Sequence, residues 1–316
     1  MPEASPTERA AAVASGFAGS AVSSMRRFER GLHHHVYDVA CADGRAFVVR
    51  LGAAGEARYF EGARTWHALL TPIGTPLPRI LASGEHEGHP FLILERLPGV
   101  DLEDAFDSLG EDDRRALAAA IAAIQDRVQT LPEGRGFGDA LSYDGPYTGA
   151  TWAAVIESFI DRSRRRLAGY EAGLAALIGR AEAGAAQLAP YFAAVRPRPF
   201  LDDITTKNVI VHERRLSGIV DVDWLCFGDR LMPVALTRNS MLCTGRTPDY
   251  AAFWLEAHRP TDAERRALRF YTALYALDFI SENGQLFNRD APVRVDDGRL
   301  ERLRRTLSDE LDAALG

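Results

Sequence analysis

Two aspartates and an asparagine between residues 203 and 221 have the types and spacing that phosphoryl transfer requires. Asp203 lies five residues before Asn208, which opens the apolar run Val209–Val211. A polar turn then leads to a second apolar run that ends at Asp221. Two strands joined by a tight turn are antiparallel neighbours, so the start of one lies beside the end of the other. The pattern predicts that Asn208 and Asp221 meet at one edge of a hairpin, with Asp203 in the loop beside them.

Such a group of oxygen atoms suits a particular chemistry. Carboxylate and amide oxygens can hold Mg²⁺ against the phosphates of ATP. A separate carboxylate can orient an attacking hydroxyl group and accept its proton. Asp203 is therefore the candidate base, and Asn208 and Asp221 are the candidate Mg²⁺ ligands. Asp202 is a second candidate for the base, and Asp223 is either an outer metal ligand or a solvated neighbour.

The first 95 residues are predicted to form mostly antiparallel sheet. Short runs with β-branched or aromatic residues indicate strands, and the Asp43-Gly44 pair indicates a hairpin turn. Apolar residues at helical spacing predict a helix over 56–70. The predicted strands are 24–28, 36–41, 46–51, 80–83 and 91–94, after an alanine-rich helix at 6–17.

After a linker at Leu97-Pro98-Gly99 the pattern becomes helical. One β segment, residues 200–225, interrupts the helices and contains the candidate catalytic residues. The predicted helices are 102–106, 112–130, 152–168, 171–189, 249–257, 261–283 and 300–315. Residues 134–149 form the most loop-like segment.

This arrangement resembles the aminoglycoside phosphotransferase and choline-kinase-like family, the small-molecule branch of the protein-kinase fold. That family has an Asp-x-x-x-x-Asn loop, two short strands and a metal-binding Asp, which Asp203, Asn208 and Asp221 match. The resemblance implies an α+β, two-lobed protein-kinase-like fold. Its small antiparallel-sheet lobe is expected to span residues 1–96, and its mainly helical lobe residues 97–316.

The resemblance also implies an activity. The expected reaction moves the γ-phosphoryl group of ATP, with Mg²⁺, to a hydroxyl group of a small molecule. An aminoglycoside-like antibiotic, a sugar or an amino alcohol would fit as acceptor. The alternative is the same fold used as a nucleotide-binding or regulatory protein without phosphoryl transfer.

The chain departs from the family pattern directly before the candidate base. Leu201 and Asp202 stand where the family usually has His-Gly. The histidine supports the backbone of the catalytic loop, so Leu201 implies a different anchor. Gly228-Asp229, after the candidate metal ligand, fits the pattern.

The residues that are expected to bind the nucleotide are assigned from the resemblance. A cation on the third strand of the family's small lobe pairs with the ATP phosphates and with a helix glutamate, and Arg50 occupies that place. The alternative is that Arg50 is a surface residue at the end of its strand. The expected partner of Arg50 is Glu61, with Glu56 as the alternative. Backbone groups near Glu95 and Leu97 are expected to bind adenine.

Three consecutive histidines, His33 to His35, lie where the family has its nucleotide-covering loop. Neighbouring strand residues point to opposite faces, so they chelate a metal poorly. A loop over the phosphates is the favoured interpretation, and an exposed hairpin turn is the alternative.

Lys207 is the only lysine among 37 basic residues. It lies four residues after Asp203, inside the candidate catalytic loop. Its compact charge could offset charge on the γ-phosphate, or its side chain could simply be exposed.

The acceptor site is less well defined. In the family, C-terminal helices line it, and Asp278, Glu282 or Asp290 could hold a cationic acceptor. The basic run at residues 162–166 is predicted to be a solvated helix face.

Composition sets further bounds. The net charge is −7 and the pI is about 5.7, which disfavours nucleic acid as a partner. Three cysteines without CxxC spacing indicate neither a disulfide framework nor a zinc site. No signal peptide or membrane span is expected, so we expect a cytoplasmic protein that acts as a monomer or homodimer.

Overall fold

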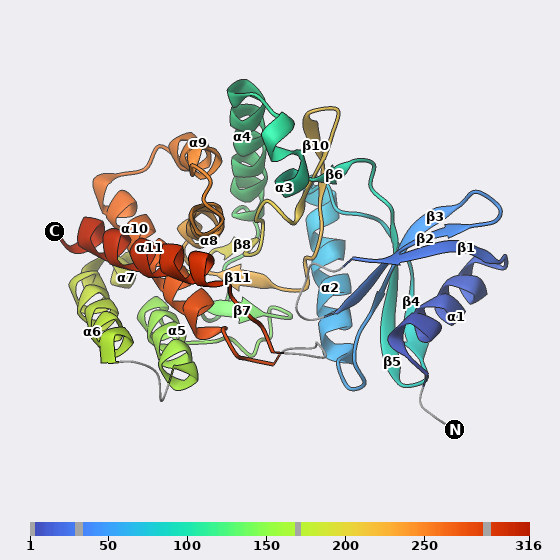
Figure 1. Ribbon diagram of the computed structural model, residues 1–316, viewed down its shortest axis with the longest axis horizontal. Coiled ribbons are helices and arrows are strands. Elements are labelled where there is room, and N and C mark those ends of the chain that lie inside the picture. Colours follow the sequence, from blue (N-terminus) through green and yellow to red (C-terminus); the bar gives the residue numbers. More distant parts are fainter. Residues whose placement is uncertain (1–3, 29–33, 168–171, 287–291) are drawn as a thin grey trace.

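The computed structural model describes residues 4–28, 34–167, 172–286 and 292–316. An antiparallel sheet dominates the N-terminal part of the chain, and helices dominate the rest (Figure 1). The expected two-lobed α+β fold is therefore confirmed. The boundary at residues 96 and 97 stays a prediction.

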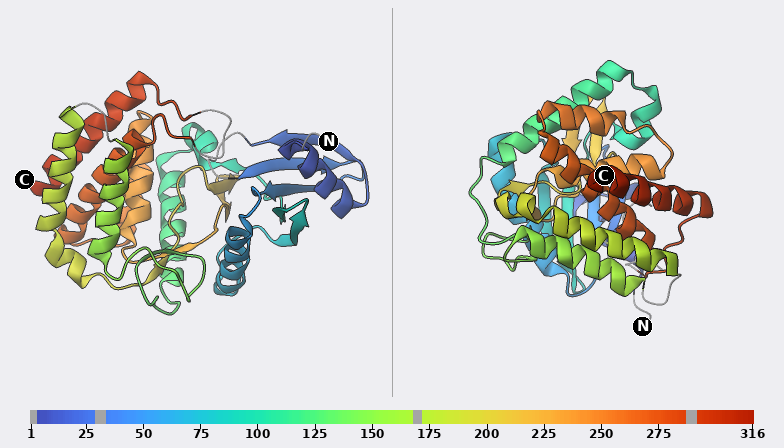
Figure 2. Two further views of the ribbon diagram at one scale, coloured as in Figure 1. Left: turned by 90° about the horizontal axis from the view of Figure 1, so that it is seen from below. Right: turned by 90° about the vertical axis from the view of Figure 1, so that its left-hand side faces the viewer.

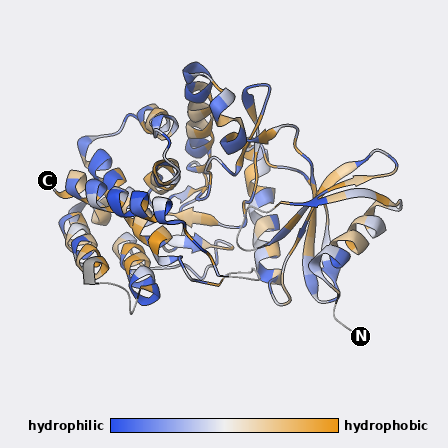
Figure 3. Cartoon of the chain, in the orientation of Figure 1, coloured by the Kyte–Doolittle hydropathy of each residue, from blue (hydrophilic) through white to orange (hydrophobic). Residues whose placement is uncertain are grey.

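The small lobe is built on a five-stranded sheet of order β1-β2-β3-β5-β4, in which every described pair is antiparallel. Its strands are β1 (Val22–Arg27), β2 (His35–Cys41), β3 (Ala46–Leu51), β4 (Ile80–His86) and β5 (His89–Glu95). Hydrophobic residues lie along parts of this sheet in Figure 3, whereas β1 is mostly polar. The predicted Asp43-Gly44 turn joins β2 to β3, and Gly44 has the positive φ that such a turn requires.

Two helices accompany this sheet. α1 (Pro6–Ala18) begins with a capping box between Ser5 and Glu8, and its buried alanines pack against β1, β2 and β3. α2 (Ala57–Leu70) contacts β5 and also reaches the large lobe, where the Trp66 indole donates a hydrogen bond to the Ala140 carbonyl oxygen (2.9 Å). The helix therefore connects the sheet to the lobe that carries the candidate catalytic loop.

The large lobe is mainly helical. Its helices are α3 (Leu102–Ala105), α4 (Glu111–Val128), α5 (Trp152–Arg166), α6 (Ala172–Gln187), α7 (Ala189–Ala194), α8 (Leu231–Cys243), α9 (Asp249–Ala257), α10 (Asp262–Ser281) and α11 (Asp297–Leu315). α10 packs against α5, α8 and α11. The yellow-green and orange-to-red helices lie together at the end of the molecule away from the small sheet (Figure 2).

Two small three-stranded sheets support the candidate site. One has the order β10-β9-β6 and the other β7-β11-β8. Their strands are β6 (Val100–Asp101), β7 (Gly138–Ala140), β8 (Pro199–Phe200), β9 (Val209–His212), β10 (Arg215–Ile219) and β11 (Leu225–Phe227). The catalytic loop runs from β8 to β9, so both sheets determine its position.

The linker between the lobes passes close to β9. Gly99 has a φ of +107°, and a Cβ at this position would overlap the carbonyl oxygen of Val211. A glycine is therefore required where the chain enters the large lobe. Among the described residues, no helix is both long enough and apolar enough to cross a membrane.

Candidate active site

The β9–β10 hairpin brings the predicted metal ligands together. Its turn residues Glu213 and Arg214 have φ values of 48° and 62°, as in the tight turns that suit twisted antiparallel strands. The N–H of Val220 donates to the carbonyl oxygen of Asn208 (2.9 Å). Asn208 therefore lies directly beside the residue that precedes Asp221.

Asp221 has an unusual backbone conformation. Its φ is +65°, in the left-handed region that residues other than glycine seldom adopt. Its side chain is 48% exposed, so this conformation presents the carboxylate to solvent at the end of the hairpin. Strained conformations of this kind are concentrated at functional sites.

Asp203 is held in the loop before β9 from two sides. The Asn208 amide Nδ2 donates to the Asp203 carbonyl oxygen (2.9 Å), and the Thr205 hydroxyl donates to the Asp203 carboxylate (3.2 Å). Desolvation, followed by the charge of Asp221, raises the pKa of the Asp203 carboxyl to about 6. A carboxylate with a pKa near 6 is a better proton acceptor than an ordinary aspartate.

Asp202 has a different environment from Asp203. Its carboxylate accepts a long hydrogen bond from the Tyr275 hydroxyl (3.4 Å). Burial, then the charges of Asp203 and Asp139, raise the pKa of Asp202 to about 7. The charge of Asp221 raises the pKa of Asp203, and Asp202 bonds to Tyr275, so the two carboxylates face different groups.

A glutamine takes over the support that a histidine gives in related catalytic loops. The fully buried Gln125, on α4, donates from Nε2 to the Leu201 carbonyl oxygen (2.6 Å), and its Oε1 accepts from the Leu201 N–H (3.0 Å). The sequence predicted that a residue other than histidine supports the loop at Leu201, but it did not identify that residue. No sequence signal marked Gln125, which lies 76 residues away.

Arg50 is the buried cation of the site, as its place on β3 suggested. Its guanidinium binds both carboxylate oxygens of Asp223, and Nη2 also lies 3.0 Å from Asp221 Oδ1. Both Arg50 and Asp223 are about 5% exposed. Asp223 is therefore not a solvated neighbour, and the charge of Arg50 helps to lower its pKa to about 2 against the opposing effect of burial.

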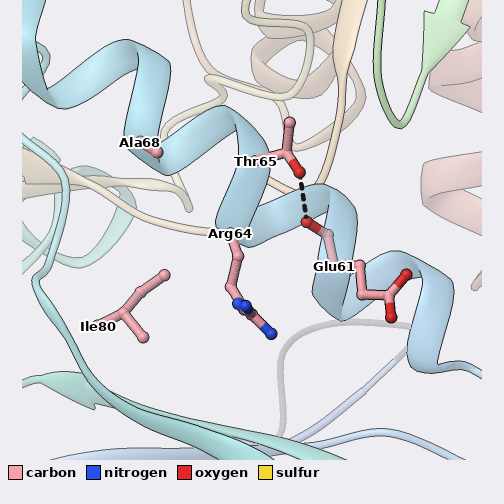
Figure 4. A pocket seen from close by; sticks show the side chains of 5 residues that line it. All are labelled: Glu61, Arg64, Thr65, Ala68 and Ile80. Atoms are coloured by element: carbon pink, nitrogen blue, oxygen red, sulfur yellow. Dashed lines mark hydrogen bonds between the residues drawn. The ribbon is translucent and has the colours of Figure 1, made fainter. Parts of the chain in front are cut away.

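The structure does not bring Glu61 to Arg50. Glu61 is exposed on α2 and lines a groove of about 640 Å³ with Arg64, Thr65, Ala68 and Ile80 (Figure 4). The alternative partner, Glu56, precedes α2 and is one of the charges that act on Arg50. The expected pair of Arg50 with Glu61 is not formed in this structure.

Of the three histidines, His34 belongs to the site. Its Nε2 lies 3.3 Å from Asp223 Oδ2 and its Nδ1 3.5 Å from Glu56 Oε2. His33 lies outside the described residues, and His35 opens β2. No group of three or more His, Cys, Asp or Glu side chains suited to a metal ion occurs in the part of the chain that the structure describes.

The hinge-like residues Glu95 and Leu97 lie at the end of β5 and just beyond it. Glu95 ends β5, and its side chain forms an ion pair with Arg79 (3.1 Å). Leu97 packs close to Gly218 on β10. Both therefore lie at the junction of the two lobes, where their backbone groups remain candidates for binding adenine.

Lys207 is exposed beside the candidate base. Its positive charge partly opposes the rise in the pKa of Asp203. The side chain is therefore close enough to influence the reacting carboxylate electrostatically.

The donor set fits a magnesium ion. Because Asn208 uses Nδ2 to hold Asp203, its amide oxygen remains available, and Asp221 presents an exposed carboxylate beside it. Mg²⁺ is usually held by one or two carboxylates together with substrate phosphates and water. A preformed cluster of acidic side chains is therefore not needed.

The acidic residues proposed for the acceptor are only partly available. Asp278 is buried and already binds Arg162 (3.0 Å) and Arg166 (3.1 Å). The prediction that the basic run is simply a solvated face is wrong for these two arginines. Burial, then the charge of Asp278, raises the pKa of Glu282 to about 7, and Asp290 lies outside the described residues.

The family is established by sequence comparison. The sequence profile of the phosphotransferase enzyme family matches residues 24–271, which include Arg50, the candidate base and the candidate metal ligands. The fold and the site define a kinase-like phosphotransferase that acts on small molecules. The chain belongs to the phosphotransferase enzyme family. No curated protein matches it significantly in sequence.

Solved structures support the fold. A thermostable mutant of aminoglycoside phosphotransferase APH(4)-Ia has a TM-score of 0.74 at 20% identity, over 97% of this chain and 99% of that one. A further mutant of that enzyme, solved with ADP and hygromycin B, has a TM-score of 0.70 at 20% identity, over 97% and 99%. The putative fructosamine-3-kinase from Thermobifida fusca YX-ER1 has a TM-score of 0.61 at 17% identity, over 96% and 98%.

Proposed function

We propose that the protein transfers the γ-phosphoryl group of ATP to a hydroxyl group of a small molecule. One observation supports this proposal: a buried cation, Arg50, lies close to the loop and hairpin that carry the candidate base and the two candidate metal ligands. Arg50 from the small lobe lies 3.0 Å from Asp221, and Asn208 links Asp221 through the hairpin to the loop of Asp203.

The roles follow from the chemistry of each group. Asp203 accepts the proton of the acceptor hydroxyl group while the hydroxyl oxygen forms a bond to the γ-phosphorus of ATP. The bond between that phosphorus and the bridging oxygen breaks, and ADP leaves. Asn208 and Asp221 would hold Mg²⁺, which would neutralise phosphate charge. Arg50, whose guanidinium lies 3.0 Å from Asp221, binds the phosphates. Backbone groups of Glu95 and Leu97 bind adenine.

Asp203 is favoured over Asp202 as the base by its neighbours. It shares its loop with Asn208 and feels the charge of Asp221, whereas Asp202 bonds to Tyr275. A base must lie near both the acceptor hydroxyl and the phosphates that the metal holds. Asp203 meets the second requirement through these contacts.

An ATP-consumption screen would test the proposal. The panel comprises aminoglycosides, macrolides, sugars and amino alcohols, with ADP release and the phosphorylated product both measured. We expect turnover with one class and a loss of about 10³-fold or more in kcat for Asp203→Asn. Asp202→Asn should retain a much larger fraction of kcat because its carboxylate faces Tyr275.

The opposite results are equally clear. Turnover by Asp203→Asn at the wild-type rate would exclude Asp203 as the base. Tight ATP binding without turnover on the whole panel would favour the nucleotide-binding or regulatory alternative. AMP attached to the product would indicate nucleotidyl transfer instead.

A further inference from the structure

Arg50 needs a counter-charge at a buried position. It is 5% exposed on β3, and an unpaired buried guanidinium would be strongly destabilising. In related proteins a glutamate on the helix after the third strand supplies this charge. Here Glu61 is exposed on α2 and forms no hydrogen bond or ion pair with Arg50 in the described structure.

Asp223 supplies the counter-charge from the large lobe. Its two oxygens accept from the two terminal nitrogens of the Arg50 guanidinium. This fork-to-fork geometry fixes the plane of the guanidinium as well as its position. One edge of the same group then lies 3.0 Å from Asp221, the candidate metal ligand.

The packing of α2 explains why the helix does not provide the partner. A Cβ on Gly62 would lie 2.9 Å from the carbonyl oxygen of Asp223, so the helix backbone approaches this residue closely. The helix face nearest to Asp223 therefore carries a glycine. The neighbouring Glu61 lies on the exposed side, in the groove of Figure 4.

Asp223 also contacts a second part of the small lobe. His34 Nε2 lies 3.3 Å from its Oδ2, and the imidazole packs edge-on against Phe60 of α2. His34 directly precedes β2, at the end of the segment expected to cover the nucleotide. One carboxylate thus contacts both the candidate phosphate-binding cation and the start of this strand.

We propose that Asp223 is the positioning residue for Arg50, in place of the glutamate on α2, and that it holds the guanidinium ready for the nucleotide phosphates. This inference rests on the proposed function. It makes nucleotide binding by the small lobe depend on a carboxylate of the large lobe, even without metal.

Isothermal titration with ADP in EDTA tests this role apart from any metal. The full chain is compared as wild type, Asp223→Asn, Arg50→Gln and the double variant. We expect Asp223→Asn to raise the Kd for ADP about tenfold or more. In the Arg50→Gln background the same substitution should change the Kd less than about twofold, because Asp223 acts through Arg50.

Three further variants complete the design. Asp249→Asn removes a carboxylate from another Arg–Asp pair, with Arg114 (2.9 Å), and should bind ADP like the wild type. Asp223→Glu should recover part of the affinity by restoring the charge. Glu61→Gln tests the alternative partner directly. If Asp223→Asn is too unstable to measure, the double variant, which leaves no unpaired buried charge, is compared with Arg50→Gln alone.

Each outcome supports or overturns the inference. Wild-type ADP affinity for Asp223→Asn in EDTA, with a loss only when Mg²⁺ is added, would assign Asp223 to the metal and overturn it. A loss of affinity in Glu61→Gln equal to that in Asp223→Asn would also overturn it, as would a further large loss in the double variant. If the wild type itself bound no nucleotide, the proposed function would fail and this inference with it.

Discussion

The Gln125 side chain forms both of its backbone hydrogen bonds with a single residue, Leu201, directly before the candidate catalytic aspartates. The amide donates to the Leu201 carbonyl oxygen and accepts from the Leu201 N–H. Gln125 is fully buried on α4. Gln125 therefore fixes the start of the catalytic loop to α4.

Replacing this side chain should cost both stability and activity. Gln125→Leu leaves a buried N–H and a buried carbonyl without partners, so we expect the free energy of unfolding to fall by about 2–4 kcal/mol. The kcat should also fall, about tenfold or more, because Asp203 follows two residues after the freed backbone. Urea unfolding and steady-state kinetics measure the two effects.

Gln129→Leu is the matched control for this experiment. It makes the same chemical change at the C-terminal cap of the same helix, away from the catalytic loop. We expect its stability to stay within about 0.5 kcal/mol of the wild type. Equal losses in both variants would show that Gln125 supports α4 in general and not the loop.

Asp221 should determine the Mg²⁺ requirement. Asp221→Asn removes one charged oxygen ligand, so we expect the Mg²⁺ concentration for half-maximal activity to rise about tenfold or more. Titrating Mg²⁺ at fixed ATP measures this shift. Asp249→Asn, on α9, should leave the titration unchanged. An unshifted curve for Asp221→Asn would remove this residue from the metal site.

Lys207 should act on the proton acceptor through its charge. Removing it in Lys207→Ala favours the protonated form of Asp203, so the pKa on the acid limb of kcat should rise above about 6. Lys207→Arg should keep the wild-type profile. Arg214→Ala removes an exposed cation from the β9–β10 turn and serves as the control. Wild-type pH profiles for both Lys207 variants would mean that the side chain is merely exposed.

Much of the fold could be predicted because its helices and strands have periodic hydrophobic patterns or are separated by turn residues. The strand β2 alternates in burial, and the Asp43-Gly44 turn marks its hairpin with β3. The helix predicted over 249–257 is α9 with the same limits. α8 was missed because 11 of its 13 residues are buried, so it has no polar face and no helical period. Pro233 inside it reads as a helix breaker, although it lies in the first turn, where proline is tolerated.

In the candidate site, the contacts between residues close in the chain could be predicted and those between distant residues could not. Asp203, Asn208 and Asp221 belong to one loop and one hairpin, so their spacing along the chain was sufficient to bring them together. The pair of Arg50 with Asp223 joins residues 173 positions apart across the two lobes. Such a contact depends on how the lobes pack, and no local spacing encodes it. The same holds for Gln125 and Leu201.

Asp202 should make stability depend on pH. Its pKa is raised to about 7 from an ordinary value of 3.8, mainly by burial. The folded protein therefore binds this proton more tightly than the unfolded chain does. This contribution to stability is fully present below about pH 4 and is lost as the pH rises through 7. At pH 8 the charged carboxylate then opposes folding, because it is desolvated and lies near Asp203.

The neutral variant Asp202→Asn should remove this penalty. We expect it to be more stable than the wild type by about 1–2 kcal/mol at pH 8, and we expect the difference to shrink towards zero near pH 4. Thermal unfolding of both proteins across this range measures the effect. Asp161→Asn, on the exposed face of α5, should show no such trend because its carboxylate is 49% exposed. An equal difference at both pH values would mean that Asp202 does not titrate near 7 and that the asparagine acts only through its hydrogen bond with Tyr275.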